Sequence, residues 1–115
     1  MSLAGRTVLV TGGGTGIGKG VAAAVVAAGG NAMLVGRNAD RLAAAAEELS
    51  ADRTGAVRYE PADVTNEDEV ARVVEAATAW TGRLYGVVHC AGGSETIGPI
   101  TQIDSEAWRR TVDLN

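Results

Sequence analysis

The segment Thr11–Gly18, TGGGTGIG, decides the fold because it joins a short β-branched run to a helical pattern. The run before it, residues 7–11 (TVLVT), predicts a strand, and residues 17–28 predict a helix. Glycines at such a junction permit a tight turn, let a diphosphate approach bare backbone and let the helix pack closely on the sheet. The amides at the helix N-terminus also attract phosphate. The segment therefore predicts a dinucleotide-binding turn.

The glycine spacing is T-G-x-x-x-G-x-G, formed by Gly12, Gly16 and Gly18. The spacing G-x-G-x-x-G is absent, because it would need glycine at position 17 or 19. A P-loop is excluded because Lys19 is followed by glycine and not by Ser or Thr. The alternative, a turn that binds no ligand, is disfavoured by the strand before it and the helix after it. The expected cofactor-binding residues of the turn are Gly12, Gly14, Thr15, Gly16, Ile17 and Gly18.

Strand and helix patterns alternate along the rest of the chain. Further strands are predicted at residues 32–36, 56–60 and 84–90. The first helix is expected to end at Gly29-Gly30. Its expected buried stripe consists of Ile17, Val21, Ala24, Val25 and Ala28.

Three more helices are predicted, each with a capping residue at its start. Asn38 is expected to cap the second helix, and Asp104 or Ser105 opens the fourth. Thr65 is expected to cap the third, with Asp68 completing a variant capping box. The expected apolar faces are Leu42, Ala45, Ala46 and Leu49 in the second helix, Val70, Val73, Val74, Ala77 and Trp80 in the third, and Trp108 and Val112 in the fourth.

This alternation predicts an α/β fold over residues 1–115, a doubly wound parallel sheet of the Rossmann type with helices on both faces. The last residue, Asn115, falls inside the fourth amphipathic helix, where a domain boundary is not expected. We therefore expect the chain to be a truncated NAD(P)-binding domain from a longer protein.

Composition narrows the class of protein. A hydrophobic share of 46% and a charged share of 21% are typical of a globular domain with a packed core. The net charge of −4 argues against nucleic acid as a partner. No signal peptide or membrane-spanning run is evident, and the one cysteine suits a reducing compartment. We expect a cytoplasmic protein with no membrane partner.

The ordered set of motifs resembles the classical short-chain dehydrogenases/reductases. The T-G-x-x-x-G-I-G turn is followed by Asp63-Val64 after the third strand, by Ala91-Gly92 after the fourth and by Asn115 in the next helix. The resemblance covers the whole chain and about the first half of the family fold. It implies an oxidoreductase that transfers hydride between a nicotinamide dinucleotide and a small-molecule carbonyl, alcohol or enoyl substrate.

The end of the second strand bears on the choice of cofactor. In a Rossmann unit an acid there bonds the ribose 2′-hydroxyl of NAD, whereas an arginine nearby accepts the 2′-phosphate of NADP. Gly36 takes the place of the acid and Arg37 follows it. This pattern predicts NADP(H) rather than NAD(H), with Arg37, Asn38 and the Thr15 hydroxyl around the 2′-phosphate. The alternative is that Arg37 is a solvated residue beside a helix cap.

The resemblance also gives roles to the later motifs. It implies that Asp63 accepts a hydrogen bond from the adenine amino group, with the Val64 backbone at the ring. The alternative for Asp63 is a turn or capping residue. Ala91 and Gly92 are expected to keep a small, open edge against the nicotinamide ribose.

Relatives carry Asn-Asn where this chain has His89-Cys90. We expect Cys90 to act as a small hydrophobe and not as a nucleophile. His89 is the only histidine, so a histidine-cluster metal site is excluded and no metal is expected. We expect its imidazole to be half-buried at the strand end.

The residues that would protonate the substrate are not in this sequence. The resemblance implies a Tyr-x-x-x-Lys pair with a nearby Ser, whereas position 63 follows Tyr59 by four residues and is Asp, and position 89 follows Tyr85 by four and is His. Asn115 matches the asparagine that completes the family's catalytic tetrad, and a polar residue inside a helix is the alternative. We expect these 115 residues alone to be inactive.

Two further questions concern the substrate and the assembly. The run TGGGTGIGKG, the Gly92-Gly93 pair and the helix with Trp108 resemble the enoyl-CoA and 2,4-dienoyl-CoA reductase branch of the family. That resemblance implies a homo-oligomer, a tetramer or dimer, with the third and fourth helices at the subunit interface. The alternative function is a non-catalytic dinucleotide-binding or interaction fragment that ends near residue 115.

Overall fold

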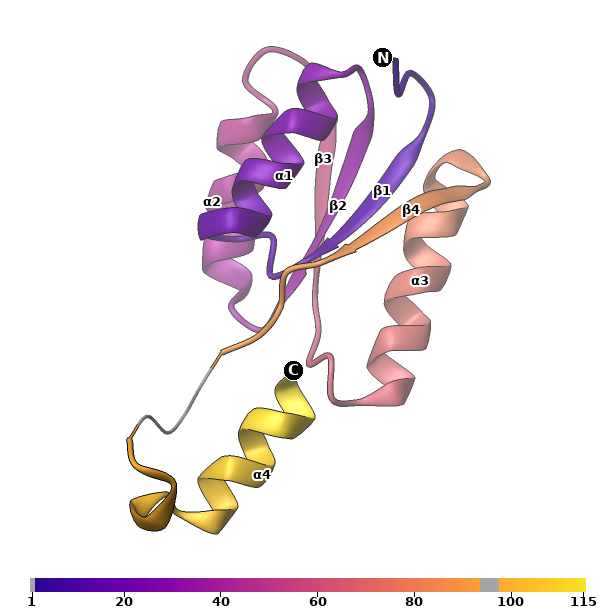
Figure 1. Ribbon diagram of the computed structural model, residues 1–115. Coiled ribbons are helices and arrows are strands. Elements are labelled where there is room, and N and C mark those ends of the chain that lie inside the picture. Colours follow the sequence, from indigo (N-terminus) through magenta and orange to yellow (C-terminus); the bar gives the residue numbers. More distant parts are fainter. Residues whose placement is uncertain (1, 94–97) are drawn as a thin grey trace.

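The computed structural model describes residues 2–93 and 98–115, and strands alternate with helices along them (Figure 1). In chain order the elements are β1 (Thr7–Thr11), α1 (Gly16–Ala27), β2 (Asn31–Gly36), α2 (Ala39–Leu49), β3 (Val57–Pro61), α3 (Glu67–Thr81), β4 (Leu84–His89), η1 (Ile100–Gln102) and α4 (Ser105–Leu114). The predicted order of strands and α-helices is confirmed, with boundaries shifted by one or two residues. The sequence pattern did not predict η1, a 3₁₀ turn.

The four strands form one parallel sheet in the order β3-β2-β1-β4. Helices α1 and α2 cover one face and α3 the other, while α4 lies beyond the carboxyl ends of the strands (Figure 1). The predicted α/β fold, a doubly wound parallel sheet with helices on both faces, is therefore confirmed. Strand order reverses between the β1-β2-β3 run and β4, so the carboxyl ends of β1 and β4 flank the switch point where such sheets hold ligands.

The core consists of two layers, because successive side chains of a strand point to opposite faces. Both central strands are almost wholly buried, as expected for a parallel sheet covered on both sides. The layer beneath α1 and α2 contains Val8, Val10, Ala22, Val25, Leu34 and Leu42. The layer beneath α3 contains Leu9, Met33, Val35, Val73 and Ala77.

The stripe predicted for α1 is confirmed at Val21, Val25 and Ala28, which are buried or pack against the core, and wrong at its other two residues. The buried residues of this helix are Gly18, Ala22 and Val25. Ala24 is exposed and Ile17 is 81% exposed, although both were expected to be buried. The physical reason is the start of the helix, where a Cβ at Gly18 would overlap the carbonyl of Gly12. The helix turns its glycine toward that backbone, and this rotates Ile17 into solvent.

The cap predicted for α3 is also wrong by one residue. Asn66 caps the helix, with its Oδ1 accepting from the Glu69 amide at 3.1 Å, so an Asn66–Glu69 pair replaces Thr65–Asp68. Thr65 is unavailable because its hydroxyl donates to Asp63 at 2.6 Å. The confirmed caps are Asn38 on α2 and Asp104 on α4.

Candidate functional site

The glycine turn touches the loop that follows β4. Gly12 has a φ of +67°, and its amide donates to the Val35 carbonyl at 2.8 Å. A Cβ at Gly12 would lie 2.8 Å from the Ala91 nitrogen and from the Cys90 carbonyl group. Only glycine combines this conformation with so close an approach. The turn after β1 and the loop after β4 therefore meet at the switch point of the sheet.

The Thr11 side chain at the end of β1 also forms hydrogen bonds with the loop after β4. Its buried hydroxyl accepts from the Cys90 amide at 3.1 Å and from the Ala91 amide at 3.2 Å. The sequence pattern does not predict this role for Thr11. The available signal is a hydroxyl at the last position of a strand that is otherwise apolar from Val8 to Val10.

The N-terminus of α1 presents backbone amides beside the turn. The first backbone hydrogen bond of the helix runs from the Lys19 amide to the Thr15 carbonyl. The amides of residues 16–18 therefore have no carbonyl partner within the helix. Gly16 has a φ of +56°, and a Cβ there would meet nothing within 4 Å. Thr15 makes no side-chain capping bond. Free amides, the positive end of the helix dipole and open space fit a diphosphate group.

A hollow of about 830 Å³ lies between this turn and the start of α2. It brings together six of the predicted site residues, Gly12, Gly14, Thr15, Arg37, Asn38 and Gly92. Arg41, which is not among the predicted site residues, lines it as well. The signal is the capping geometry, because the Arg41 amide donates to the Asn38 side chain at 3.1 Å and so places position 41 beside the cap. Asp40 is the acid among the lining residues.

A smaller hollow of about 150 Å³ adjoins the first and shares Gly12, Gly36, Arg37 and Gly92 with it. Its other lining residues are Ala62, Asp63, Val64, Ala91 and Leu114. The structure thus gathers the predicted motifs that follow β1, β2, β3 and β4 at one end of the sheet. Gly16, Ile17, Gly18 and Asn115 line neither hollow.

The Asp63 carboxylate is held by its neighbour. Its Oδ1 accepts from the Thr65 hydroxyl at 2.6 Å and from the Thr65 amide at 2.9 Å. These bonds, with a smaller contribution from the positive charge of Arg37, hold the pKa of Asp63 below its ordinary value. Both bonds use Oδ1, so Oδ2 remains available to a donor that enters the small hollow.

Asn115 contacts the loop after β4 through its side chain. The carboxamide nitrogen donates to the Gly93 carbonyl at 2.6 Å, and the oxygen accepts from the Gly93 amide at 3.2 Å. The residue follows the end of α4 and lies beside Gly92, which lines the small hollow, without lining the hollow itself.

Groups that could donate a proton to a substrate lie elsewhere. Tyr59 is on β3, Tyr85 lies beneath the Arg6 guanidinium at 4.3 Å, and the Lys19 ammonium pairs with Glu48. None of the tyrosines or the lysine lines either hollow. Within residues 2–93 and 98–115 no group of three or more His, Cys, Asp or Glu side chains could hold a metal ion.

The prediction for His89 is wrong in one respect. His89 ends β4 as expected, but its side chain is exposed and not half-buried. The reason is that β4 is an edge strand of this sheet, and alternate residues along it face outward. Cys90 packs against the core beneath α1 and α2, as predicted for a small hydrophobe.

The comparisons with known proteins agree with this geometry. The family model described as "short chain dehydrogenase" matches residues 6–115. The chain belongs to the short-chain dehydrogenase family. The predicted resemblance is thereby confirmed for the family as a whole.

Individual relatives within the short-chain dehydrogenase family cover nearly all of the chain. A 3beta-hydroxysteroid dehydrogenase 2 from Eggerthella lenta is 33% identical over 98% of the chain and 43% of the relative. A structure of a short-chain type dehydrogenase/reductase from Mycobacterium ulcerans is 71% identical, with a TM-score of 0.95, over 100% of the chain and 42% of that protein. The chain thus spans less than half the length of these two relatives.

A third likeness is to the C-domain of a bacterial malonyl-CoA reductase, in a structure with NADP. It is 29% identical with a TM-score of 0.88, over 98% of the chain and 18% of that protein. In the described part of this short-chain dehydrogenase, no helix has both the length and the apolar character needed to cross a membrane.

Proposed function

We propose that these residues bind NADP(H), and that the complete protein is an NADP(H)-dependent oxidoreductase. One observation carries the choice of NADP(H) over NAD(H). Arg37, Asn38 and Thr15 line one hollow, and Gly36 takes the position at which an acid would repel a 2′-phosphate. The guanidinium of Arg37 offers a planar fork of donors that matches phosphate.

Arg41 extends this proposal. It lines the same hollow from the first turn of α2, so a phosphate there would meet two guanidinium groups and the positive end of a helix dipole. Asp40 opposes them with one negative charge. We therefore assign the larger part of the preference to Arg37 and a smaller part to Arg41.

The remaining site residues receive proposed roles from their positions. The turn from Gly12 to Gly18 would hold the diphosphate, Asp63 and Val64 the adenine, and Ala91 and Gly92 the nicotinamide ribose. The bound dinucleotide would supply the hydride chemistry. The proton donor is proposed to lie in sequence outside these 115 residues, since no tyrosine or lysine of this chain lines the hollows. The substrate class we propose is a carbonyl, an alcohol or an enoyl compound.

The experiment is a calorimetric titration of the complete gene product with NADPH and with NADH. We expect NADPH to bind at least about tenfold more tightly, since a charge-assisted bond contributes about 1.5 to 3 kcal/mol. Arg37→Ala should remove most of that difference, and Arg41→Ala a smaller part. Arg83→Ala is the matched control, because this exposed arginine precedes β4 at the opposite end of the sheet. Equal affinities that survive Arg37→Ala would refute the proposed preference.

The second candidate is a dinucleotide-binding fragment without catalysis. It is favoured by the position of Tyr59, Tyr85 and Lys19 away from the hollows. The mass of the native protein separates the two candidates. A protein about twice this length with a Tyr-x-x-x-Lys sequence supports the enzyme, whereas a native chain ending near residue 115 that binds NADPH supports the fragment.

A further inference from the structure

Asp63 comes shortly after β3, an edge strand of the sheet. The backbone groups of residues 61–63 make hydrogen bonds on two opposite sides of the chain. The Ala62 amide points inward and donates to the Gly36 carbonyl of β2 at 2.8 Å. The Pro61 carbonyl and the Asp63 amide have their partners on the other side, where the described part of the chain adds no further strand to the sheet. Without partners these two groups would be free to reorient in solvent.

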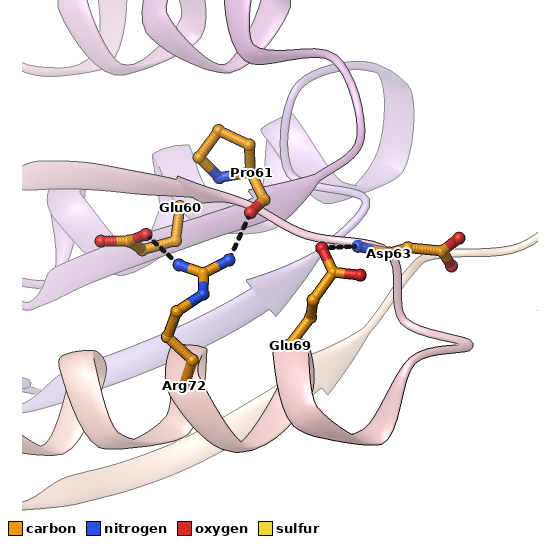
Figure 2. A network of polar contacts seen from close by, with 5 residues as sticks. All are labelled: Glu60, Pro61, Asp63, Glu69 and Arg72. Carbon is orange, nitrogen blue, oxygen red and sulfur yellow. Dashed lines mark hydrogen bonds and ion pairs between the residues drawn. The ribbon is translucent and has the colours of Figure 1, made fainter.

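On the side of residues 61–63 away from β2, two side chains of α3 provide the hydrogen-bond partners (Figure 2). The Arg72 guanidinium donates to the Pro61 carbonyl at 2.8 Å and pairs with the Glu60 carboxylate at 2.7 Å. The Glu69 carboxylate accepts from the Asp63 amide at 3.4 Å. The segment from Pro61 to Asp63 is thus held to β2 on one side and to α3 on the other.

The Glu69 contact differs from an ordinary capping box. In such a box the third helical residue bonds the amide of the capping residue itself. Here the Asn66 amide donates to the Asp63 carbonyl at 3.0 Å, and Glu69 reaches three residues further back to the Asp63 amide. The start of the helix therefore holds the backbone of a residue that lines the small hollow.

We infer that Arg72 and Glu69 are positioning residues that orient Asp63 for the adenine amino group. The inference rests on the proposed function. Neither residue lines the two hollows, so we expect their effect on binding to pass through the backbone of residues 61–63 that they contact. The backbone next to Asp63 is held on both sides, and Thr65 bonds the Oδ1 of the Asp63 side chain. We infer that the other oxygen, Oδ2, is thereby held in one direction. Specificity for adenine over a purine without the amino group then depends on α3.

The test compares NADPH with its hypoxanthine analogue, deamino-NADPH, which lacks the amino group. Affinities are measured by calorimetry on the complete gene product. The unaltered protein should bind NADPH at least about tenfold more tightly than the analogue, as expected for a hydrogen bond to a carboxylate. Asp63→Ala should abolish this ratio. Arg72→Met and Glu69→Ala should lower it to about threefold or less by loosening the same bond.

Two variants serve as controls. Glu69→Gln keeps an acceptor oxygen and should retain the ratio. Glu67→Ala makes the same change of charge in the same first turn of α3 and should also retain it. If Arg72→Met does not fold, Glu69→Ala carries the test alone.

The outcomes separate the inference from the proposed function. A ratio unchanged in both Arg72→Met and Glu69→Ala would overturn the inference, even if both variants unfold at lower temperature, because a merely structural role weakens both ligands equally. A ratio that survives Asp63→Ala would also overturn it. Failure of the unaltered protein to bind either NADPH or NADH would overturn the proposed function and the inference with it.

Discussion

Asn115 and Gly93 form a reciprocal pair of hydrogen bonds between a carboxamide and a peptide unit. The Asn115 nitrogen donates to the Gly93 carbonyl at 2.6 Å and to the Thr111 carbonyl at 2.7 Å, and the oxygen accepts from the Gly93 amide at 3.2 Å. A Cβ at Gly92 would overlap this oxygen, so the neighbouring glycine gives the pair its space. The end of α4 is thereby tied to the loop after β4, while a catalytic role for Asn115 stays a prediction.

Asn115→Asp should break this link. A carboxylate cannot donate to the carbonyls of Gly93 and Thr111 and would repel them, so we expect the side chain to turn away from the loop and the Gly93 amide to lose its acceptor as well. We expect the Gly93 amide to exchange with solvent about tenfold faster, measured by hydrogen exchange and NMR. Asp113→Asn, an exposed change in the same helix, is the control. Unchanged protection of the Gly93 amide in Asn115→Asp would contradict the role given to the pair.

Gly18→Ala and Gly20→Ala should have opposite effects on stability. A methyl group at Gly18 meets the Gly12 backbone, which cannot move without disturbing the turn, whereas at Gly20 it meets nothing within 4 Å. We expect Gly18→Ala to lower the free energy of unfolding by about 3 kcal/mol or more. Gly20→Ala should raise it by up to about 1 kcal/mol through helix propensity. Urea denaturation measures both, and equal effects would show that the helix does not start as described.

These two glycines show what the sequence could and could not predict. The period of apolar residues was enough to find the strands and α-helices, because both central strands are apolar runs and α2 carries a clear stripe. The period was not enough to predict which face of α1 is buried, because the alanine-rich pattern of this helix is weakly amphipathic. The buried face is set instead by one close backbone contact, between Gly18 and Gly12. Spacing within a helix gives no information on such a contact.

The residues of the candidate site also fall into those that the sequence could predict and those that it could not. Residues at the ends of strands were predictable, because the carboxyl ends of parallel strands meet at one edge, and the structure gathers Arg37, Asp63 and Gly92 there. Arg41 and Arg72 were missed because their positions depend on how helices pack and cap. The sequence pattern predicts Thr65 as a cap, but its hydroxyl donates to Asp63 instead.

The Asp63 carboxyl should titrate below its ordinary pKa of 3.8, because the Thr65 hydroxyl and amide stabilise the charged form. A lowered pKa in the folded state means that this stabilisation is present above the pKa of the unfolded chain and is lost as pH falls through the folded value. Thr65→Val removes the hydroxyl bond and should raise the pKa. Carbon-detected NMR titration measures both values. An Asp63 pKa at or above 3.8 in the unaltered protein would contradict the described contacts.

Trp108 and Val112 should contribute to a subunit interface. They lie four residues apart on α4, with exposed fractions of 52% and 57%, so they share one helix face as an apolar pair. Trp108→Glu in the complete gene product should shift the assembly toward smaller species in sedimentation velocity. Ser105→Glu adds the same charge at an exposed site of the same helix and is the control. An unchanged assembly in Trp108→Glu would exclude this face from the interface.

A crystal structure of the complete gene product with NADPH would test most directly whether the glycine turn and Arg37 bind the dinucleotide. We expect the diphosphate against the amides of residues 16–18 and the 2′-phosphate within hydrogen-bond distance of the Arg37 guanidinium, with the adenine amino group on Asp63 Oδ2. A dinucleotide bound away from the glycine turn, or a 2′-phosphate facing solvent with Arg37 turned away, would contradict this expectation.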